Sequence, residues 1–123
     1  MNIKEFISAV RNRPRMYVKE ERLDYVYYLI IGYLGSNLSN DNIDKEDSKF
    51  HSFFPEWLLA WTKVYVDKGY ERKNFFWYCI IKDVASSENE AFELFFKLCD
   101  EFFQQDEEAI QKFIDAADEL EDE

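Results

Sequence analysis

Turn-forming residues are scarce in this chain, which has only three glycines and two prolines among its 123 residues. A strand-rich fold that turns about every ten residues needs many more of them. Phosphate-binding loops of the P-loop and dinucleotide kinds also require more glycines than the chain contains. We therefore predict an all-α fold, a single compact bundle of five or six helices that spans residues 1–123 as one domain.

Residues that serve in catalysis and metal binding are equally rare, since the chain has one histidine and two cysteines. A zinc site needs several such ligands at close spacing, which these three residues do not provide. Cys79 and Cys99 each lie in an apolar helical run, so we interpret both as core-facing residues rather than as a disulfide. His51 lies in the aromatic cluster 50–54 and is expected to pack there. The sequence thus predicts no enzyme, no cofactor and no metal, with a His51–cysteine pair as the open alternative.

Long hydrophobic runs are missing as well. The chain has no stretch of about eighteen apolar residues that could span a bilayer. Residues 1–13 lack the continuous apolar stretch and the small-residue cleavage site of a signal peptide. We therefore expect a cytoplasmic protein without a membrane partner.

Aromatic residues, by contrast, are abundant: they make up 19% of the chain and include twelve phenylalanines. They are dense in residues 87–105, where the apolar positions form two stripes at helical spacing. A helix that is apolar over so much of its circumference must be covered by other elements, so we expect this segment to be the hub of the bundle. Ser87, followed three residues later by Glu90, forms a capping box that marks its start.

The other apolar patterns predict helices over residues 2–13, 20–34, 56–68, 75–84 and 106–120. Gly35 is expected to cap the end of the second helix, and Pro55 to open the third. Asp106 is expected to cap the start of the last helix. The run 75–81 also fits a buried strand, but we favour a helix because no partner strand is evident.

Charge is strongly one-sided, because 26 acidic and 15 basic residues give a net charge of −11. Residues 87–123 hold fourteen acidic and two basic residues and so carry most of the excess. Such a field repels phosphate backbones, which argues against nucleic acid and favours a basic protein as the partner. We expect the acidic face that binds this partner to comprise Glu93, Asp100, Glu101, Glu107, Glu108, Asp115, Asp118 and Glu119. Solvation of helix faces, together with acidic first turns that suit the helix dipole, is the alternative.

Two further segments are polar throughout. Residues 36–49, rich in Asn, Asp and Ser, predict a mobile polar loop, and residues 119–123 predict an acidic frayed tail. The loop is a second candidate contact with the partner, through the carboxylates of Asp41, Asp44, Glu46 and Asp47. An EF-hand calcium site is not indicated, because Ile43 interrupts the alternating ligands and the required glycine is missing.

Basic residues gather near the start of the chain, at Arg11, Arg13, Arg15, Lys19 and Arg22. The even spacing of these residues around Pro14 suits ion pairs within the protein better than contact along the groove of a nucleic acid. We therefore expect the arginines to pair with the acidic C-terminal helix and so close the bundle. Contact with a nucleic acid or an acidic partner is the alternative.

Several short motifs follow one another between about residues 6 and 103. They are Arg13-Pro14-Arg15-Met16-Tyr17, Gly32-Tyr33, Phe53 with Trp57-Leu58, Trp77 with Ile80-Ile81, and Glu90-Ala91-Phe92 with Leu94-Phe95-Phe96. In this order they resemble small bacterial immunity proteins, the cytoplasmic inhibitors found beside polymorphic and contact-dependent toxins. The resemblance implies that the chain binds and blocks one toxin domain, and it carries over no catalytic or toxin-facing residue.

We therefore expect an immunity protein that neutralises a cognate bacterial toxin, a basic nuclease, by steric and electrostatic occlusion. A nuclease needs a basic surface to hold RNA or DNA, and an acidic inhibitor covers such a surface with fast, steered association. The alternative is a non-catalytic adaptor or self-associating structural protein of unknown partner. The oligomeric state does not follow from the sequence.

Overall fold

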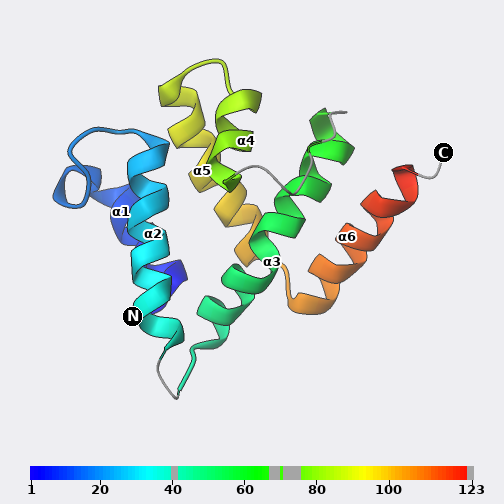
Figure 1. Cartoon of the computed structure of the whole chain (residues 1–123), viewed down its shortest axis with the longest axis horizontal. Coiled ribbons are helices and arrows are strands. Elements are labelled where there is room, and N and C mark those ends of the chain that lie inside the picture. The colour runs from blue at the N-terminus through cyan, green and yellow to red at the C-terminus, as the bar shows by residue number, and fades with distance from the viewer. Residues whose placement is uncertain (40–41, 67–69, 71–75, 122–123) are drawn as a thin grey trace.

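The structure, a computed structural model, describes all residues except 40–41, 67–69, 71–75 and 122–123. Its described residues form six α-helices, so the predicted all-α fold of five or six helices is confirmed. The helices are α1 (Ile3–Asn12), α2 (Leu23–Leu38), α3 (Lys45–Trp61), α4 (Trp77–Val84), α5 (Glu88–Phe103) and α6 (Glu107–Glu121). A 3-10 turn, η1 (Pro14–Met16), follows α1, and a π-helical segment, η2 (Thr62–Val66), continues α3. Figure 1 shows α3 crossing the molecule between α2 and α6.

Polar side chains fix the starts of several helices. A capping box at Asn2 begins α1. The hydroxyl of Ser87 accepts the backbone N–H of Glu90 at 3.1 Å, which confirms the predicted cap of α5, although the Glu90 carboxylate accepts the backbone N–H of Ser86 instead of that of Ser87. Asp106 caps α6 as predicted, through a 2.8 Å hydrogen bond from a backbone N–H. Each cap stabilises its helix by about 1 kcal/mol.

Aromatic residues of α3, α4 and α5 form the centre of the core. The rings of Phe54 and Phe102 meet edge to face with centroids 5.4 Å apart, and Trp57 meets Phe102 in the same way at 5.6 Å. Trp77 stacks on Phe95 at 5.1 Å. Such pairs add about 0.5–1.5 kcal/mol each beyond the apolar area they bury. The predicted hub α5 thus lies in the core, but it shares that role with α3, which also contacts α1, α2 and α6.

The start of α3 differs most from the prediction. The helix begins at Lys45 instead of after Pro55, because Asp44 caps it by accepting the backbone N–H of Glu46 at 2.8 Å. Pro55 lies inside α3 and lacks an N–H for the carbonyl of His51. His51 is exposed, so water can satisfy that carbonyl. The earlier start brings Phe50 onto the core side of α3.

Helices also replace most of the predicted polar loop 36–49. The second helix runs to Leu38, so Gly35 lies inside α2 and does not cap it. The last turn of α2 is held because Leu38 is half-buried and the Asn37 amide donates to the Asp47 carboxylate at 3.0 Å. The predicted acidic tail is likewise helical as far as Glu121.

The chain segment 77–84 is the helix α4 and not the alternative strand, with Trp77, Ile80 and Ile81 buried on one side. The last helix, α6, packs on α3 and η2 through one narrow side. Ile110 and Ala117 are buried there. The rest of its circumference faces outward at the edge of the molecule (Figure 1).

Candidate functional site

The acidic residues of α6 form two stripes on its outward sides. Glu108, Asp115 and Glu119 are exposed, and their spacing of seven and four residues places them on the side opposite α3. The Lys112 Nζ lies 3.2 Å from the Glu108 carboxylate, and the Gln111 amide donates to Asp115 at 2.9 Å. Because such fully exposed pairs contribute little energy, they leave the stripe available to a partner. We call Glu108, Asp115 and Glu119 the α6 acidic stripe.

The second stripe of α6 lies beside η2. Glu107 and Asp118 share this side because they are eleven residues apart, or three helical turns. The Lys63 Nζ of η2 lies 3.6 Å from the Asp118 carboxylate. This stripe is therefore partly neutralised by the chain itself.

The acidic residues of α5 are more closely matched by cations. Glu93, Asp100 and Glu101 share the outward side of α5 with Lys97, which stands four residues from both glutamates. The Arg11 guanidinium of α1 binds the Asp100 carboxylate at 2.6 Å. Of the eight predicted partner-binding acids on the two helices, those of α6 thus carry most of the uncompensated charge.

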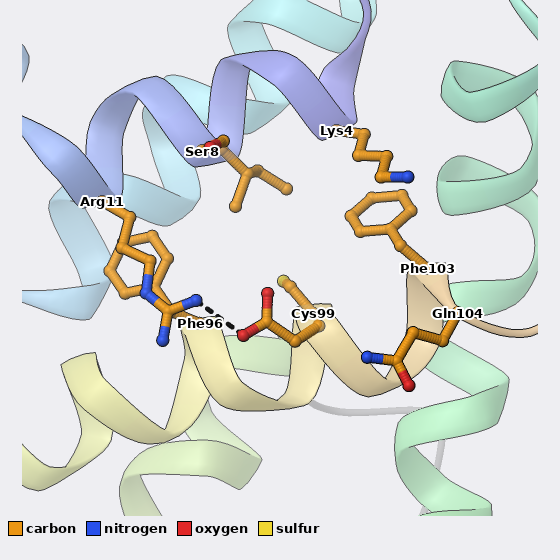
Figure 2. Close-up of a pocket in the computed structure, with 9 residues that line it drawn as sticks. Lys4, Ser8, Arg11, Phe96, Cys99, Phe103 and Gln104 are labelled. Atoms are coloured by element: carbon orange, nitrogen blue, oxygen red, sulfur yellow. Dashed lines mark hydrogen bonds and ion pairs between the residues drawn. The ribbon is translucent and has the colours of Figure 1, made fainter.

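A groove of about 360 Å³ lies between α1 and α5 and includes that ion pair. Figure 2 shows Lys4, Ser8 and Arg11 of α1 facing Phe96 and Phe103 of α5 across it. The guanidinium of Arg11 lies 5.8 Å from the centre of the Phe96 ring, so a cation already occupies the aromatic wall. The lining of the groove thus combines apolar side chains with charges of both signs.

The thiol of Cys99 lines this groove, and its burial disfavours the thiolate. It is buried, as predicted, and burial raises the pKa of the Cys99 thiol well above its ordinary value. The thiolate, which is the reactive form, is therefore scarce at neutral pH. Cys79 is exposed, so the prediction that it faces the core is wrong.

His51 lines a separate hollow of about 280 Å³ between α2, α3 and the start of α4. The described residues around it are aromatic, aliphatic or proline, and none of them offers a carboxylate or a thiol. The described lining therefore supplies no carboxylate or thiol to pair with His51 in catalysis. In the described part of the chain, no three His, Cys, Asp or Glu side chains come together as metal ligands, and no helix is long and apolar enough to cross a membrane.

The predicted loop contact is wrong for Asp47, which is a structural residue. Its side chain is only 2% exposed. The carboxylate accepts the backbone N–H of Ile3 at 2.5 Å and the side-chain amide of Asn37 at 3.0 Å. Asp47 therefore joins the start of α1, the end of α2 and the first turn of α3, and it does not face a partner.

The other loop candidates are also engaged in local structure. Asp44 caps α3, and half-buried Glu46 lies in the first turn of that helix. The Glu46 carboxylate is 3.8 Å from the Nζ of Lys49, which is itself buried and lies over the ring of Phe102 at 5.3 Å. Asp41 lies outside the described residues. The loop therefore offers less acidic surface than its sequence suggested.

The basic segment does not pair with the last helix as predicted. Arg11 reaches α5 at Asp100, but Arg22 binds its near neighbour Asp24 at 3.0 Å. The Arg15 guanidinium donates to the backbone carbonyl of Lys19 at 2.6 Å. These arginines bind partners near the turn after α1. They do not reach α6, because α6 lies on the far side of α3 from α1 (Figure 1).

The sequence reasoning missed one surface, the outward side of α2. Tyr25, Tyr28 and Ile31 are exposed there together with Gly32 and Gly35. A signal was present, since no charged residue occurs between Asp24 and the end of the helix. A helix that is apolar on all sides yet lies at the edge of a bundle leaves part of its apolar surface uncovered.

Three surfaces of the molecule therefore offer binding chemistry: the α6 acidic stripe, the groove between α1 and α5, and the outward side of α2. A scan against protein-family models, a search of curated proteins and a search of solved structures each found no match for this chain.

Proposed function

We propose that the chain is an immunity protein that binds a cognate bacterial toxin domain, a basic nuclease, and neutralises it by steric and electrostatic occlusion. The observation that supports this most is the α6 acidic stripe. It faces outward from a helix at the edge of the molecule (Figure 1). Within the described residues, the cations within ion-pair distance of any α6 carboxylate are Lys63 and Lys112.

Rigidity makes the stripe suitable for recognition. Phe113 of α6 packs against Trp57 of α3, with ring centroids 6.1 Å apart, so the helix is anchored to the aromatic core. With a rise of 1.5 Å per residue, Glu108 and Glu119 are about 16 Å apart along the axis. A row of carboxylates over that length matches the basic groove in which a nuclease holds a phosphate backbone.

Electrostatic steering supports inhibition as the purpose of this surface. An inhibitor must reach the toxin before the toxin reaches nucleic acid, and opposite charges raise association rates strongly at low salt. The resemblance to immunity proteins in the order of the aromatic and turn motifs gives independent support. The groove between α1 and α5 is a secondary contact, where a partner's lysine or arginine replaces Arg11 at the Asp100 carboxylate.

The test begins with the partner. The tagged chain is used to capture a protein from the native host, and that protein is compared with the product of the neighbouring gene. Co-expression of the chain with this product is expected to restore growth that the product alone arrests. The dissociation constant of the purified pair is then expected to rise steeply as salt increases from about 50 to 500 mM.

Two matched variants locate the contact. Asp115→Lys/Glu119→Lys is expected to weaken binding at least tenfold, or about 1.4 kcal/mol. Glu20→Lys/Glu21→Lys changes the net charge equally on an exposed segment far from α6 and is expected to change binding less than twofold. Absence of growth rescue refutes the function, and an equal loss in both variants refutes the role of the stripe. Circular dichroism establishes that both variants remain folded.

A further inference from the structure

The outward side of α2 carries no charged residue from Tyr25 to the end of the helix, and the Arg22 guanidinium lies over the Tyr25 ring, 4.8 Å from its centre. This side carries Tyr25, Tyr28, Ile31, Gly32 and Gly35, which we call the tyrosine–glycine face. Tyr28 is 58% exposed on the side of α2 away from the core, and Ile31 is 45% exposed at the edge of that side, where it borders the hollow lined by His51. Exposed tyrosines and aliphatic residues without intervening charges are typical of the centre of a protein interface.

The two glycines have no role in the packing of the chain itself. A Cβ atom added to Gly32 or Gly35 meets nothing within 4 Å. Both lie inside α2, where each glycine lowers helix stability by about 1 kcal/mol relative to alanine. A partner that approaches the helix closely explains them, because only glycine leaves its backbone open to such contact.

The tyrosines and glycines of the face lie at equal sequence distances on opposite sides of Ile30. Tyr25 and Tyr28 lie five and two residues before it, and Gly32 and Gly35 lie two and five residues after it. When two copies of α2 pack antiparallel about a two-fold axis near Ile30, each tyrosine lies across from a glycine of the other copy. Rings then fill the hollows at the glycines, which parallel packing does not achieve.

The helix dipoles favour the same arrangement, because antiparallel pairing places the positive end of one α2 beside the negative end of the other. Side-chain charges at the two ends are mixed: Arg15 and Lys19 precede the helix together with Glu20 and Glu21, and Lys45 lies between Asp44 and Glu46 after it. The strongly acidic α6 excludes a second copy from its own side of the molecule, because like charges repel.

From these observations we infer that a second copy of this chain docks on the tyrosine–glycine face, so that two α2 helices form an antiparallel, two-fold symmetric dimer. The inference does not depend on toxin binding. It places the α6 stripes outward, since α2 and α6 lie at opposite ends of the long axis of the molecule (Figure 1). A dimer of this kind presents two separate acidic surfaces to two basic partners.

Analytical ultracentrifugation of the full chain over a wide concentration range tests the dimer. We expect a species with twice the chain mass of 14.9 kDa. Gly32→Leu/Gly35→Leu is expected to raise the dissociation constant of the dimer at least tenfold while the helix content is kept, since leucine is a better helix former and a Cβ atom at either position meets nothing within 4 Å. A chain that stays monomeric at millimolar concentration overturns the inference.

A matched control is Ala109→Leu/Ala116→Leu, which adds leucine at two exposed positions of α6. We expect this variant to dimerise like the unmodified chain. Equal weakening by both variants shows that the tyrosine–glycine face is not the interface and refutes the inference.

Disulfide cross-linking tests the orientation, in a chain where exposed Cys79 has been replaced by serine. Ile31→Cys places the two thiols near the two-fold axis, only about 3 Å apart along the paired helices at 1.5 Å per residue, so that a disulfide is far easier to form there. Tyr25→Cys places them about 15 Å apart along the paired helices, at 1.5 Å per residue. Oxidation is therefore expected to cross-link Ile31→Cys and not Tyr25→Cys. Efficient cross-linking at both positions indicates parallel helices and overturns the antiparallel arrangement.

Discussion

Replacement of Asp47 by alanine tests whether a carboxylate that looks like surface in the sequence holds the fold together. The change removes two hydrogen bonds to a buried charged group, one from the Ile3 N–H and one from the Asn37 amide. Bonds of this kind contribute about 1.5–3 kcal/mol each, and the loss also leaves the Ile3 N–H without its partner. We expect Asp47→Ala to lower the free energy of unfolding by about 3–4 kcal/mol, a large share of the total for a chain of this size.

Urea denaturation followed by tryptophan fluorescence and circular dichroism measures this loss. The midpoint is expected to fall without a change in slope, and the melting temperature to fall by about 10 °C. Asp47→Asn keeps one acceptor oxygen and is expected to lose about half as much. Asp115→Ala, which removes an exposed carboxylate on α6, is the matched control and is expected to change stability by less than about 0.5 kcal/mol.

A double-mutant cycle with Asn37→Ala isolates the bond between Asn37 and Asp47. The coupling energy is expected to be at least about 1 kcal/mol, because both groups lose the same bond in either single variant. If Asp47→Ala unfolds no more easily than Asp115→Ala, the carboxylate has no structural role. The assignment of Asp47 to the core would then be wrong.

Three further predictions concern single groups. A water-soluble disulfide reagent is expected to modify Cys79 within seconds and Cys99 only on unfolding, because burial raises the pKa of the Cys99 thiol; two fast thiols in the native chain contradict this. Hydrogen bonds from the side chain and backbone of Ser86 lower the pKa of the Glu90 carboxyl. Their stabilisation is therefore complete above the ordinary glutamate pKa of about 4.3 and is lost as the pH falls through the lowered value. Glu90→Gln is expected to be less stable than the unmodified chain at pH 7 but equal to it near pH 2.5, and a difference that persists in acid refutes the linkage. Phe102→Ala removes a fully buried ring that meets Phe54 and Trp57 and is expected to cost about 3–5 kcal/mol in chemical denaturation; a loss below 1 kcal/mol contradicts its central place in the core.

Local patterns predicted the parts of the fold that depend on neighbours in sequence. The apolar stripes of residues 87–105 and the caps at Ser87 and Asp106 are set within one or two turns of helix, and the structure has them as expected. The predicted start of α3 was wrong because Pro55 was given more weight than the cap at Asp44. A proline inside a helix leaves the carbonyl four residues earlier without its hydrogen bond, and here water can satisfy the carbonyl of His51 because that residue is exposed, a condition that depends on the tertiary structure.

The sequence indicated that the candidate site is rich in acidic residues, but it did not show which of these residues lie on the surface. Asp44 and Asp47 look alike in the sequence, yet one caps a helix at the surface and the other is buried between three helices. The difference arises from Ile3 and Asn37, which are distant from Asp47 along the chain. Similarly, the count of acidic residues in 87–123 indicated a charged face. It did not show that Arg11 and Lys97 lie among the acidic residues of α5 and offset their charge.

The α6 acidic stripe and the tyrosine–glycine face have opposite chemistry, so they are expected to bind different partners. The α6 acidic stripe attracts basic molecules from a distance and repels another copy of the chain. The tyrosine–glycine face exerts little long-range force, so it selects by shape, and the tyrosines and glycines of α2 match those of a second α2. Salt therefore discriminates between the two contacts: it should weaken capture of a basic partner on α6 while leaving association through α2 nearly unchanged.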